Sequence, residues 1–126
     1  MHIEHIGIYV ADLEAAKQFY IRYFEGTAGD NYHNPRTGFT SCFIRFDSGA
    51  RIELMHKDSV HQPAPAGHLG FGHLSLRVGS QEGVDQLTNR LRADGYPVLS
   101  EPRTTGDGYY ESLIAGVEGH PIEILA

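Results

Sequence analysis

Two histidines and two glutamates occupy matching places in two similar halves of this 126-residue chain. His5 opens a stretch of alternating residues, and His73 opens a second such stretch 68 residues later. Glu53 and Glu123 stand between aliphatic neighbours near the end of each half, 70 residues apart. Imidazole and carboxylate groups together suit Ni, Co, Mn, Fe or Zn. Four such ligands leave up to two coordination positions open, as a catalytic metal requires. We therefore predict that these four side chains bind one metal ion.

The prediction rests on the repeat, because single residues of these types carry little information. A lone histidine in a strand is usually a polar surface residue, and a lone glutamate between aliphatic residues usually marks the exposed side of a strand. The remaining histidines have no counterpart at the repeat offset or lie in predicted loops and turns: His2, His33, His56, His61, His68 and His120. Only the two matched pairs are predicted to be ligands.

The first half reads as strand, helix and further strands. Residues 3–10 alternate between aliphatic and other side chains, which is typical of a strand. Asp12 is a suitable helix N-cap, apolar residues then recur at helical spacing, and Gly26 can supply a left-handed stop. After a polar loop, residues 40–47 and 50–55 are predicted strands joined by a hairpin at Asp47-Ser48-Gly49.

The second half repeats this order. A strand that includes His73 opens it, Ser80 is the predicted helix cap, and Gly95 is the predicted stop. Short strands are predicted near residues 96–99, 109–115 and 121–125. The class is therefore α+β, with two paired βαβββ modules at about 1–58 and 70–126 in a single domain of residues 1–126. A Pro- and Gly-containing loop, 56–70, joins them.

Strand periodicity also predicts where the four ligands point. The aliphatic residues Ile6 and Ile8, and later Ile52 and Leu54, should lie under the helix. His5 and Glu53 then lie on the uncovered face of the sheet, and the same parity applies to His73 and Glu123. Two such faces brought together would form a concave cup with one His–Glu pair from each half.

Composition excludes several classes of function. The net charge of −6 argues against nucleic acid or an anionic membrane as a partner. The single cysteine, Cys42, excludes an intrachain disulfide. The start of the sequence lacks the features of a signal peptide, and no stretch is apolar enough for a membrane span. The expectation is a cytoplasmic protein with a small-molecule substrate.

At these residues the chain resembles the vicinal oxygen chelate superfamily, and within it glyoxalase I (lactoylglutathione lyase). The similar segments are the opening His5-Ile6-Gly7-Ile8-Tyr9-Val10-Ala11-Asp12-Leu13, the following Phe19-Tyr20, and the closing residues 118–123, Glu-Gly-His-Pro-Ile-Glu. The resemblance implies a homodimer in which one subunit gives His5 and Glu53 and the other gives His73 and Glu123. It favours nickel or cobalt as the metal, with zinc, manganese or iron as alternatives.

The activity that the resemblance implies is that of a lyase or isomerase. Its substrate is a hemithioacetal formed from a 2-oxoaldehyde, methylglyoxal, and a thiol. A proton moves between adjacent carbons through a metal-bound enediolate. Glu123 is the first choice for the catalytic base and Glu53 the second, because ligand carboxylates have the proton-transfer role in the family.

Three residues are weaker candidates for substrate binding. Tyr9 and Arg77 lie at matching positions of the two halves, on the face predicted for the histidines, and Arg77 could hold a carboxylate. Tyr109 belongs to a glycine-rich loop, 104–110, which could be a lid or an ordinary hairpin turn. Short bacterial glyoxalase I carries arginine where this chain has Tyr9 and asparagine where it has Lys57. The thiol is therefore left open between glutathione and another compound.

Other members of the superfamily give the alternative functions. A methylmalonyl-CoA epimerase is the nearest, although the acidity of the chain weakly disfavours binding of CoA phosphates. A ring-cleaving dioxygenase needs one carboxylate ligand rather than two, and a thiol transferase acting on fosfomycin would carry histidine in place of Glu53. A metal-free drug-binding protein, as in bleomycin resistance, typically lacks the ligand set.

Overall fold

A computed structural model of the protein describes residues 1–65 and 67–126. The chain divides into two compact units, Met1–Pro65 and Ala66–Ala126, and the described residues of each form one α-helix and one sheet. The prediction of an α+β protein with two βαβββ modules is confirmed. The predictions of a single domain and of a cup between the two sheets remain predictions.

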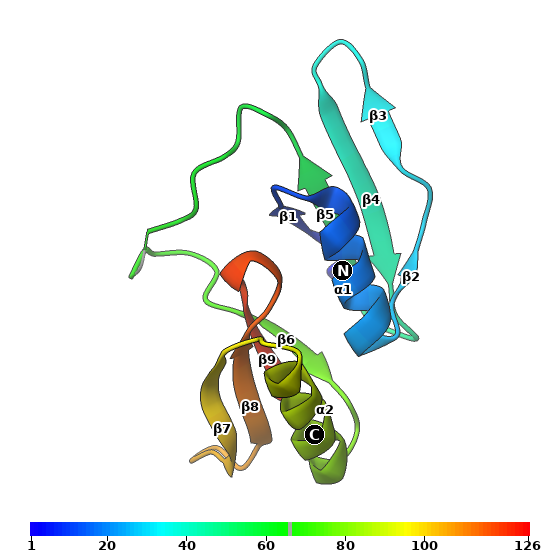
Figure 1. The fold of residues 1–126 in the computed structure, drawn as a ribbon. Coiled ribbons are helices and arrows are strands. Elements are labelled where there is room, and N and C mark those ends of the chain that lie inside the picture. Colours follow the sequence, from blue (N-terminus) through cyan, green and yellow to red (C-terminus); the bar gives the residue numbers. More distant parts are fainter. Residues whose placement is uncertain (66) are drawn as a thin grey trace. The chain divides into compact units, whose positions relative to one another are not determined.

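The first unit is a mixed five-stranded sheet, one strand more than a βαβββ module, and two of its strands are short. Its elements are β1 (His5–Tyr9), α1 (Leu13–Phe24), β2 (Thr27–Ala28), β3 (Tyr32–Asn34), β4 (Phe39–Arg45) and β5 (Arg51–His56). The strand order is β1-β5-β4-β2, and β3 pairs with β4 in a long hairpin (Figure 1). β1 runs parallel to β5, whereas β4 runs antiparallel to it. The predicted polar loop after α1 therefore contains β2 and β3, which are too short to show a period in the sequence.

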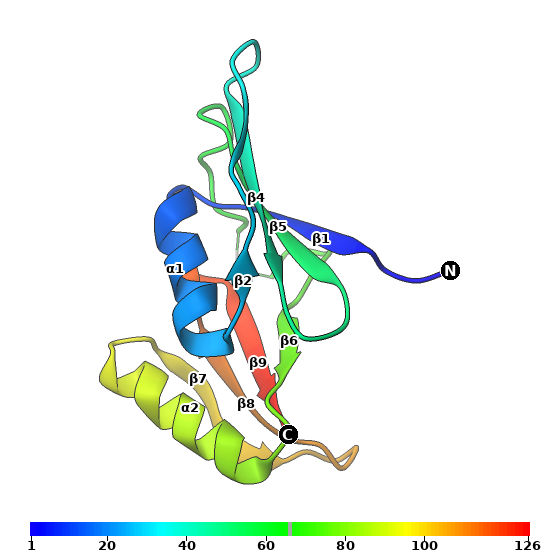
Figure 2. The ribbon, with the colours of Figure 1, turned by 90° about the vertical axis from the view of Figure 1, so that its right-hand side faces the viewer.

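Helix α1 covers one face of the first sheet (Figure 2). The Asp12 side chain caps it by accepting the amide hydrogen of Ala15 at 2.9 Å, as predicted. The core residues of this unit face one another from the helix and from the middle strands. They are Ala16, Phe19, Tyr20 and Tyr23 of α1 and Cys42, Ile44, Ile52 and Leu54 of the sheet.

The end of α1 differs from the prediction. The left-handed residue is Glu25, with φ of 54°, and not Gly26. Gly26 is required for a different reason, because a Cβ atom there would lie 2.6 Å from Cγ2 of Ile44. At Gly26 the chain leaves α1 and passes close to the sheet. Glycine is needed there because of this close packing and not because of a positive φ.

The second unit repeats the arrangement with four strands. Its elements are β6 (Leu74–Arg77), α2 (Gln81–Ala93), β7 (Val98–Thr104), β8 (Tyr110–Ala115), the short 3₁₀ helix η1 (Val117–Gly119) and β9 (Pro121–Leu125). The strand order is β6-β9-β8-β7, with β6 and β9 parallel. Helix α2 covers one face of this sheet (Figure 2). The predicted cap Ser80 accepts the amide hydrogen of Gly83, and Gly95 adopts a positive φ, as predicted.

Two boundaries of the second unit differ from the prediction. The strand predicted near residues 96–99 is β7, which begins at Val98 and continues to Thr104. Its pairing with β8 shifts register between Val98 and Arg103, and this irregularity hides the alternation in the sequence. His73 precedes β6 by one residue. Between β5 and β6 the described residues form no helix or strand, and residue 66 of the predicted joining loop lies outside the described residues.

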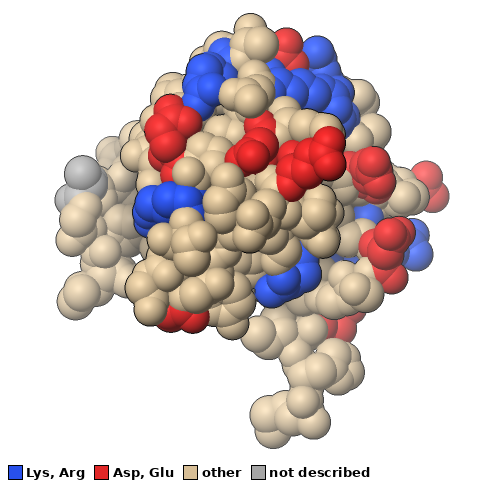
Figure 3. All heavy atoms as spheres, turned by 90° about the horizontal axis from the view of Figure 1, so that it is seen from below, with Lys and Arg blue, Asp and Glu red and all other residues tan. Residues whose placement is uncertain are grey.

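Charged side chains of both signs are interspersed on the surface shown in Figure 3. Among the described residues, no helix is both long and apolar enough to cross a membrane.

Candidate metal centre

His5 and Glu53 lie together on the first sheet because of the parallel register of β1 and β5. Glu53 is opposite Gly7, so His5 and Glu53 are diagonal neighbours with side chains on the face that α1 does not cover. Nε2 of His5 is 3.7 Å from Oε2 of Glu53. The glutamate side chain is 19% exposed and the histidine 41%. The geometry thus brings together the first predicted pair of ligands.

The other nitrogen of His5 already has a partner. Nδ1 lies 2.5 Å from Oε2 of Glu4, and the imidazole meets the ring of Phe43 edge-on at 5.3 Å between ring centres. Glu4 also forms an ion pair with Arg51. The hydrogen bond to His5, followed by the Arg51 contact, holds the pKa of Glu4 below its ordinary value, and partial desolvation opposes these effects. Glu4 is therefore a charged hydrogen-bond acceptor for Nδ1 of His5, the ring nitrogen that does not face Glu53.

His73 and Glu123 form the corresponding pair in the second unit. Nε2 of His73 is 3.4 Å from Oε2 of Glu123, whose side chain is 16% exposed. Ser75 is opposite Glu123 in the β6–β9 ladder, and its hydroxyl donates to Oε1 at 2.6 Å. One carboxylate oxygen of Glu123 is thus held by the sheet, while the other faces the histidine.

A third carboxylate, Glu111, lies beside the second pair. It belongs to β8, two residues before Leu113, which is opposite Glu123. Its side chain is 15% exposed, and one of its oxygens lies 3.6 Å from Nη2 of Arg103. Burial first, and then the negative charge of Glu123, raise the pKa of Glu111 above its ordinary value. The second unit therefore concentrates negative charge where a cation would be bound.

The spacing of each pair fits a divalent metal. Ligand bonds of 2.0–2.2 Å place neighbouring donor atoms about 3.0 Å apart, or farther when they lie opposite each other. The observed separations of 3.4 and 3.7 Å are close to this range. Within the described part of the chain, no group of three or more His, Cys, Asp or Glu side chains forms a metal-binding cluster. Each unit thus holds one His–Glu pair, and the role of these pairs as metal ligands remains a prediction.

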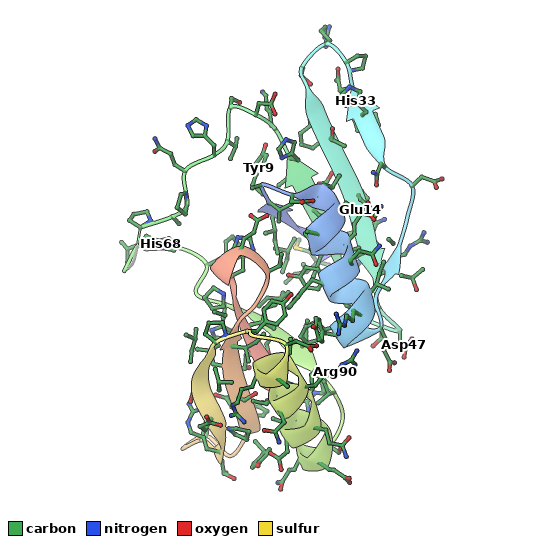
Figure 4. The ribbon with its side chains drawn as sticks, viewed as in Figure 1. Tyr9, Glu14, His33, Asp47, His68 and Arg90 are labelled. Carbon is green, nitrogen blue, oxygen red and sulfur yellow. The ribbon has the colours of Figure 1, made fainter. Side chains whose placement is uncertain are left out.

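The predicted substrate-binding residues have different surroundings. Tyr9 lies at the end of β1 (Figure 4) and is 41% exposed. Nη1 of Arg77 donates to the carbonyl oxygen of Ala126, so this guanidinium already has a partner. Tyr109 is 49% exposed, and its carbonyl oxygen accepts the amide hydrogen of Thr105 at 2.8 Å. The glycine-rich loop 104–110 is accordingly a hydrogen-bonded turn between β7 and β8.

Among the described residues, none of the other histidines joins either pair in a group of three potential metal ligands. His33 is on β3 of the long hairpin and His68 in the joining segment (Figure 4). His56 ends β5, where Nδ1 lies 3.1 Å from the carbonyl oxygen of Val10. His120 lies at the end of η1.

Three residues around the pairs were missed by the sequence interpretation: Glu4, Ser75 and Glu111. Glu4 directly precedes His5, so strand alternation predicted its side chain on the face opposite to that of His5. Ser75 and Glu111 do share the ligand face by strand alternation, and this signal could have identified them once the register was known.

Comparisons with known proteins agree with the fold. The profile of the Glyoxalase/Bleomycin resistance protein/Dioxygenase superfamily matches residues 2–124. The uncharacterized protein YqjT of Bacillus subtilis is 28% identical over 98% of both chains. A structure described as a possible glyoxalase from Bacillus cereus is 28% identical, with 100% of this chain and 99% of that one covered and a TM-score of 0.74.

Two solved enzymes show the same fold at lower identity. The trypanothione-dependent glyoxalase I of Leishmania major is 21% identical, with a TM-score of 0.80 over 99% of this chain and 86% of that one. Glyoxalase I of Zea mays is 19% identical, with a TM-score of 0.78 over 98% of this chain and 44% of that one. With the profile match over nearly all of its residues, the chain belongs to the Glyoxalase/Bleomycin resistance protein/Dioxygenase superfamily, also known as the vicinal oxygen chelate superfamily.

Proposed function

We propose that this protein is a metal-dependent glyoxalase I-like lyase that isomerises the hemithioacetal of a 2-oxoaldehyde, such as methylglyoxal, and a thiol. The observation that carries the proposal is the pair of matched half-sites, each with a His Nε2 within 3.7 Å of a Glu oxygen. A metal-free drug-binding protein has no need for two such pairs at equivalent register positions. The glyoxalase I enzymes among the structures of the same fold agree with this choice.

His5, Glu53, His73 and Glu123 would hold the metal. Nickel and cobalt are favoured, with zinc, manganese or iron as alternatives for the same donor set. The bound cation would act as a Lewis acid toward the two neighbouring oxygens of the substrate and stabilise negative charge on them. The half-sites would meet in a homodimer. Each metal site would receive His5 and Glu53 from one subunit and His73 and Glu123 from the other.

The chain's own carboxylates would move the proton. Glu123 would take the proton from the carbon that bears the thiol, leaving the electron pair on the substrate, and return the proton to the adjacent carbon, so that the substrate is isomerised without net gain or loss of atoms. Glu53 is the second choice for this role. Glu111 of β8 lies beside Glu123, and the charge of Glu123 contributes, after burial, to the raised pKa of Glu111.

The thiol is the least defined part of the substrate. Tyr9 and Lys57 stand where short bacterial glyoxalase I has residues that meet glutathione. The Leishmania major enzyme of the same fold is described as trypanothione-dependent, so the fold accommodates a thiol other than glutathione. Arg77 would have to leave Ala126 before it could bind a substrate carboxylate. The preferred thiol must therefore be identified by comparing the activity of the protein with several thiols.

The test combines metal analysis with an isomerase assay. Protein purified without chelator should contain about one divalent ion per chain. Chelation should abolish formation of the thioester from methylglyoxal and thiol, and nickel or cobalt should restore it. The assay is run with glutathione and with other low-molecular-weight thiols. Glu123→Gln should lower kcat at least a hundredfold, whereas Glu118→Gln, in η1, should not change it.

Contrary results would separate the alternatives. Protein that takes up no metal after addition of nickel or cobalt would support a binding protein instead of an enzyme. Metal uptake with no thioester from any thiol, but with exchange of the proton next to the carbonyl of a methylmalonyl thioester, would support an epimerase. Full activity of Glu123→Gln would exclude Glu123 as the base.

A further inference from the structure

The surroundings of His5 contain a network that has no counterpart among the described residues of the second unit. Glu4 accepts from Nδ1 of His5 and forms an ion pair with Arg51. The guanidinium of Arg51 lies over the ring of Phe43 at 4.1 Å, and that ring meets His5 edge-on. Glu4 and Phe43 thus both contact the imidazole, and Arg51 contacts each of these two residues.

Hydrogen-bond chemistry fixes the proton position on His5. An ionised carboxylate can only accept, so Nδ1 must carry the hydrogen of a neutral imidazole that binds Glu4. Nε2 then has a free lone pair, and this is the atom 3.7 Å from Oε2 of Glu53. Metal ligation requires such a lone pair, and the hydrogen bond made by the other nitrogen decides which one is available.

Arg51 holds Glu4 through a backbone hydrogen bond and a side-chain ion pair. The amide of Arg51 donates to the carbonyl oxygen of Glu4 at 3.0 Å, which extends the parallel β1–β5 ladder by one residue. The same residue pairs with the Glu4 carboxylate. Stacking on Phe43 limits the movement of the guanidinium. The carboxylate is therefore held at Nδ1 instead of moving freely in solvent.

The second unit has none of these groups at the matching places. Gly72 precedes His73 as Glu4 precedes His5, and Pro121 stands two residues before Glu123 as Arg51 stands before Glu53. Leu113, opposite Glu123, takes the place of Phe43, which is opposite Glu53. The network is therefore an individual property of the first half and not a feature of the repeated fold.

We propose that Glu4 is a positioning residue for the metal ligand His5, with its carboxylate holding the proton on Nδ1 and thereby presenting the Nε2 lone pair beside Glu53. The metal-binding part of this inference rests on the proposed function, whereas the proton position does not. In this role Glu4 contacts His5 and Arg51 and would not touch substrate or metal itself. Its removal should lower metal affinity by about ten- to a hundredfold, as is usual for partners of ligating histidines.

The experiment reads the proton position and the metal affinity separately. Metal-free protein with ¹⁵N-labelled histidine is examined by NMR above the pH at which imidazole titrates, and His5→Gln assigns the His5 signals. Wild-type His5 should carry its hydrogen on Nδ1. Glu4→Ala should shift it toward Nε2, and Glu4→Gln, whose amide oxygen can still accept, should retain it. The signals of His73 should remain unchanged in both variants.

Titration with Co²⁺ gives the affinity of the same proteins. Glu4→Ala should weaken binding about ten- to a hundredfold, and Glu4→Gln by less than tenfold. Glu14→Ala is the matched control, because Glu14 (Figure 4) is also exposed and also ion-paired, with Lys17, but lies in the first turn of α1. It should bind Co²⁺ as the wild type does.

The outcomes distinguish the two proposals. An unchanged His5 spectrum in Glu4→Ala overturns the positioning role whether or not metal binds. A shifted spectrum with unchanged Co²⁺ affinity shows that the network orients His5 without serving metal binding, and also overturns it. Wild-type protein that binds no Co²⁺ or Ni²⁺ contradicts the proposed function and, with it, the metal-related part of this inference.

Discussion

The hydroxyl of Ser75 donates to Oε1 of Glu123 at 2.6 Å, and the matching neighbour of Glu53 in the first unit is Gly7, which has no side chain to donate. The two half-sites are therefore supported differently. The second unit orients its glutamate through Ser75, whereas the first orients its histidine through Glu4. In the first pair the supported residue is the histidine, and in the second pair it is the glutamate.

Replacement of Ser75 by alanine should weaken metal binding. The substitution removes the hydrogen bond that aligns Glu123 and leaves the carboxylate free to turn toward solvent. Loss of such a supporting bond typically lowers metal affinity about ten- to a hundredfold. Titration of metal-free protein with Co²⁺ measures the change, and Ser48→Ala in the turn between β4 and β5 should leave the affinity unchanged. Equal affinities of Ser75→Ala and wild type would show that Glu123 needs no support.

The sequence predicts local features of this protein well. The caps Asp12 and Ser80 and the stop Gly95 depend only on residues within one helical turn, and all three are confirmed. Strand parity depends only on alternation, and it placed each His–Glu pair on the face away from its helix. The prediction of a left-handed Gly26 is wrong, because the residue is selected by contact with Ile44 of β4.

Features that depend on strand register could not be predicted. Glu111 lies near Glu123 only because β8 pairs with β9 so that Leu113 is opposite Glu123. Ser75 likewise meets Glu123 through the parallel β6–β9 register. Glu4 lies outside β1 and reaches Nδ1 of its own neighbour, against the parity of the strand. In each case the contact depends on which residues become neighbours in space, and sequence spacing alone does not give that information.

Glu111→Gln should change the pH dependence of stability in the metal-free protein. The pKa of Glu111 is raised by burial and by Glu123, so the folded state holds its proton more tightly than the unfolded state does. Stability from this group is therefore complete below the unfolded pKa, about 4.3, and decreases as pH rises through the higher folded pKa. Glutamine removes that decrease, so the variant should gain stability relative to wild type toward neutral pH.

Urea denaturation at several pH values measures this effect. The free energy of unfolding of Glu111→Gln, relative to wild type, should increase with pH above the unfolded pKa. Glu101→Gln is the control, because Glu101 is an exposed carboxylate of the same unit and is paired with Arg92. A difference between Glu111→Gln and wild type that does not vary with pH would contradict the raised pKa.

Gly26→Ala should destabilise the first unit although alanine is a better helix former. The added methyl group would lie 2.6 Å from Cγ2 of the fully buried Ile44 and 3.2 Å from the carbonyl oxygen of Tyr20. Overpacking of this kind costs about 1–3 kcal/mol. Thermal or urea denaturation gives the loss, and Gly106→Ala is the control, because nothing lies within 4 Å of a Cβ there. A Gly26→Ala protein as stable as Gly106→Ala would show that the end of α1 can move away from β4.

The pair Thr88 and Ser112 should show strong coupling in a double-mutant cycle. Both side chains are fully buried between α2 and β8, with their hydroxyl oxygens 2.7 Å apart. The Thr88 hydroxyl donates to the carbonyl oxygen of Val84 at 2.6 Å, so Ser112 must donate to Thr88, because each hydroxyl has one hydrogen. Thr88→Val leaves the Ser112 hydroxyl without this acceptor in an apolar layer, which should cost about 1–3 kcal/mol.

Removal of both hydroxyls should be less harmful than the sum of the single losses. In Thr88→Val combined with Ser112→Ala, no donor is left facing an apolar neighbour, so the interaction energy of the cycle should be about 0.5–3 kcal/mol. Urea denaturation of the four proteins measures it. Additive losses would mean that water or another group satisfies Ser112 in the single variant. The buried hydroxyl pair would then contribute packing, and not a hydrogen bond between helix and sheet, to the stability of the unit that carries His73 and Glu123.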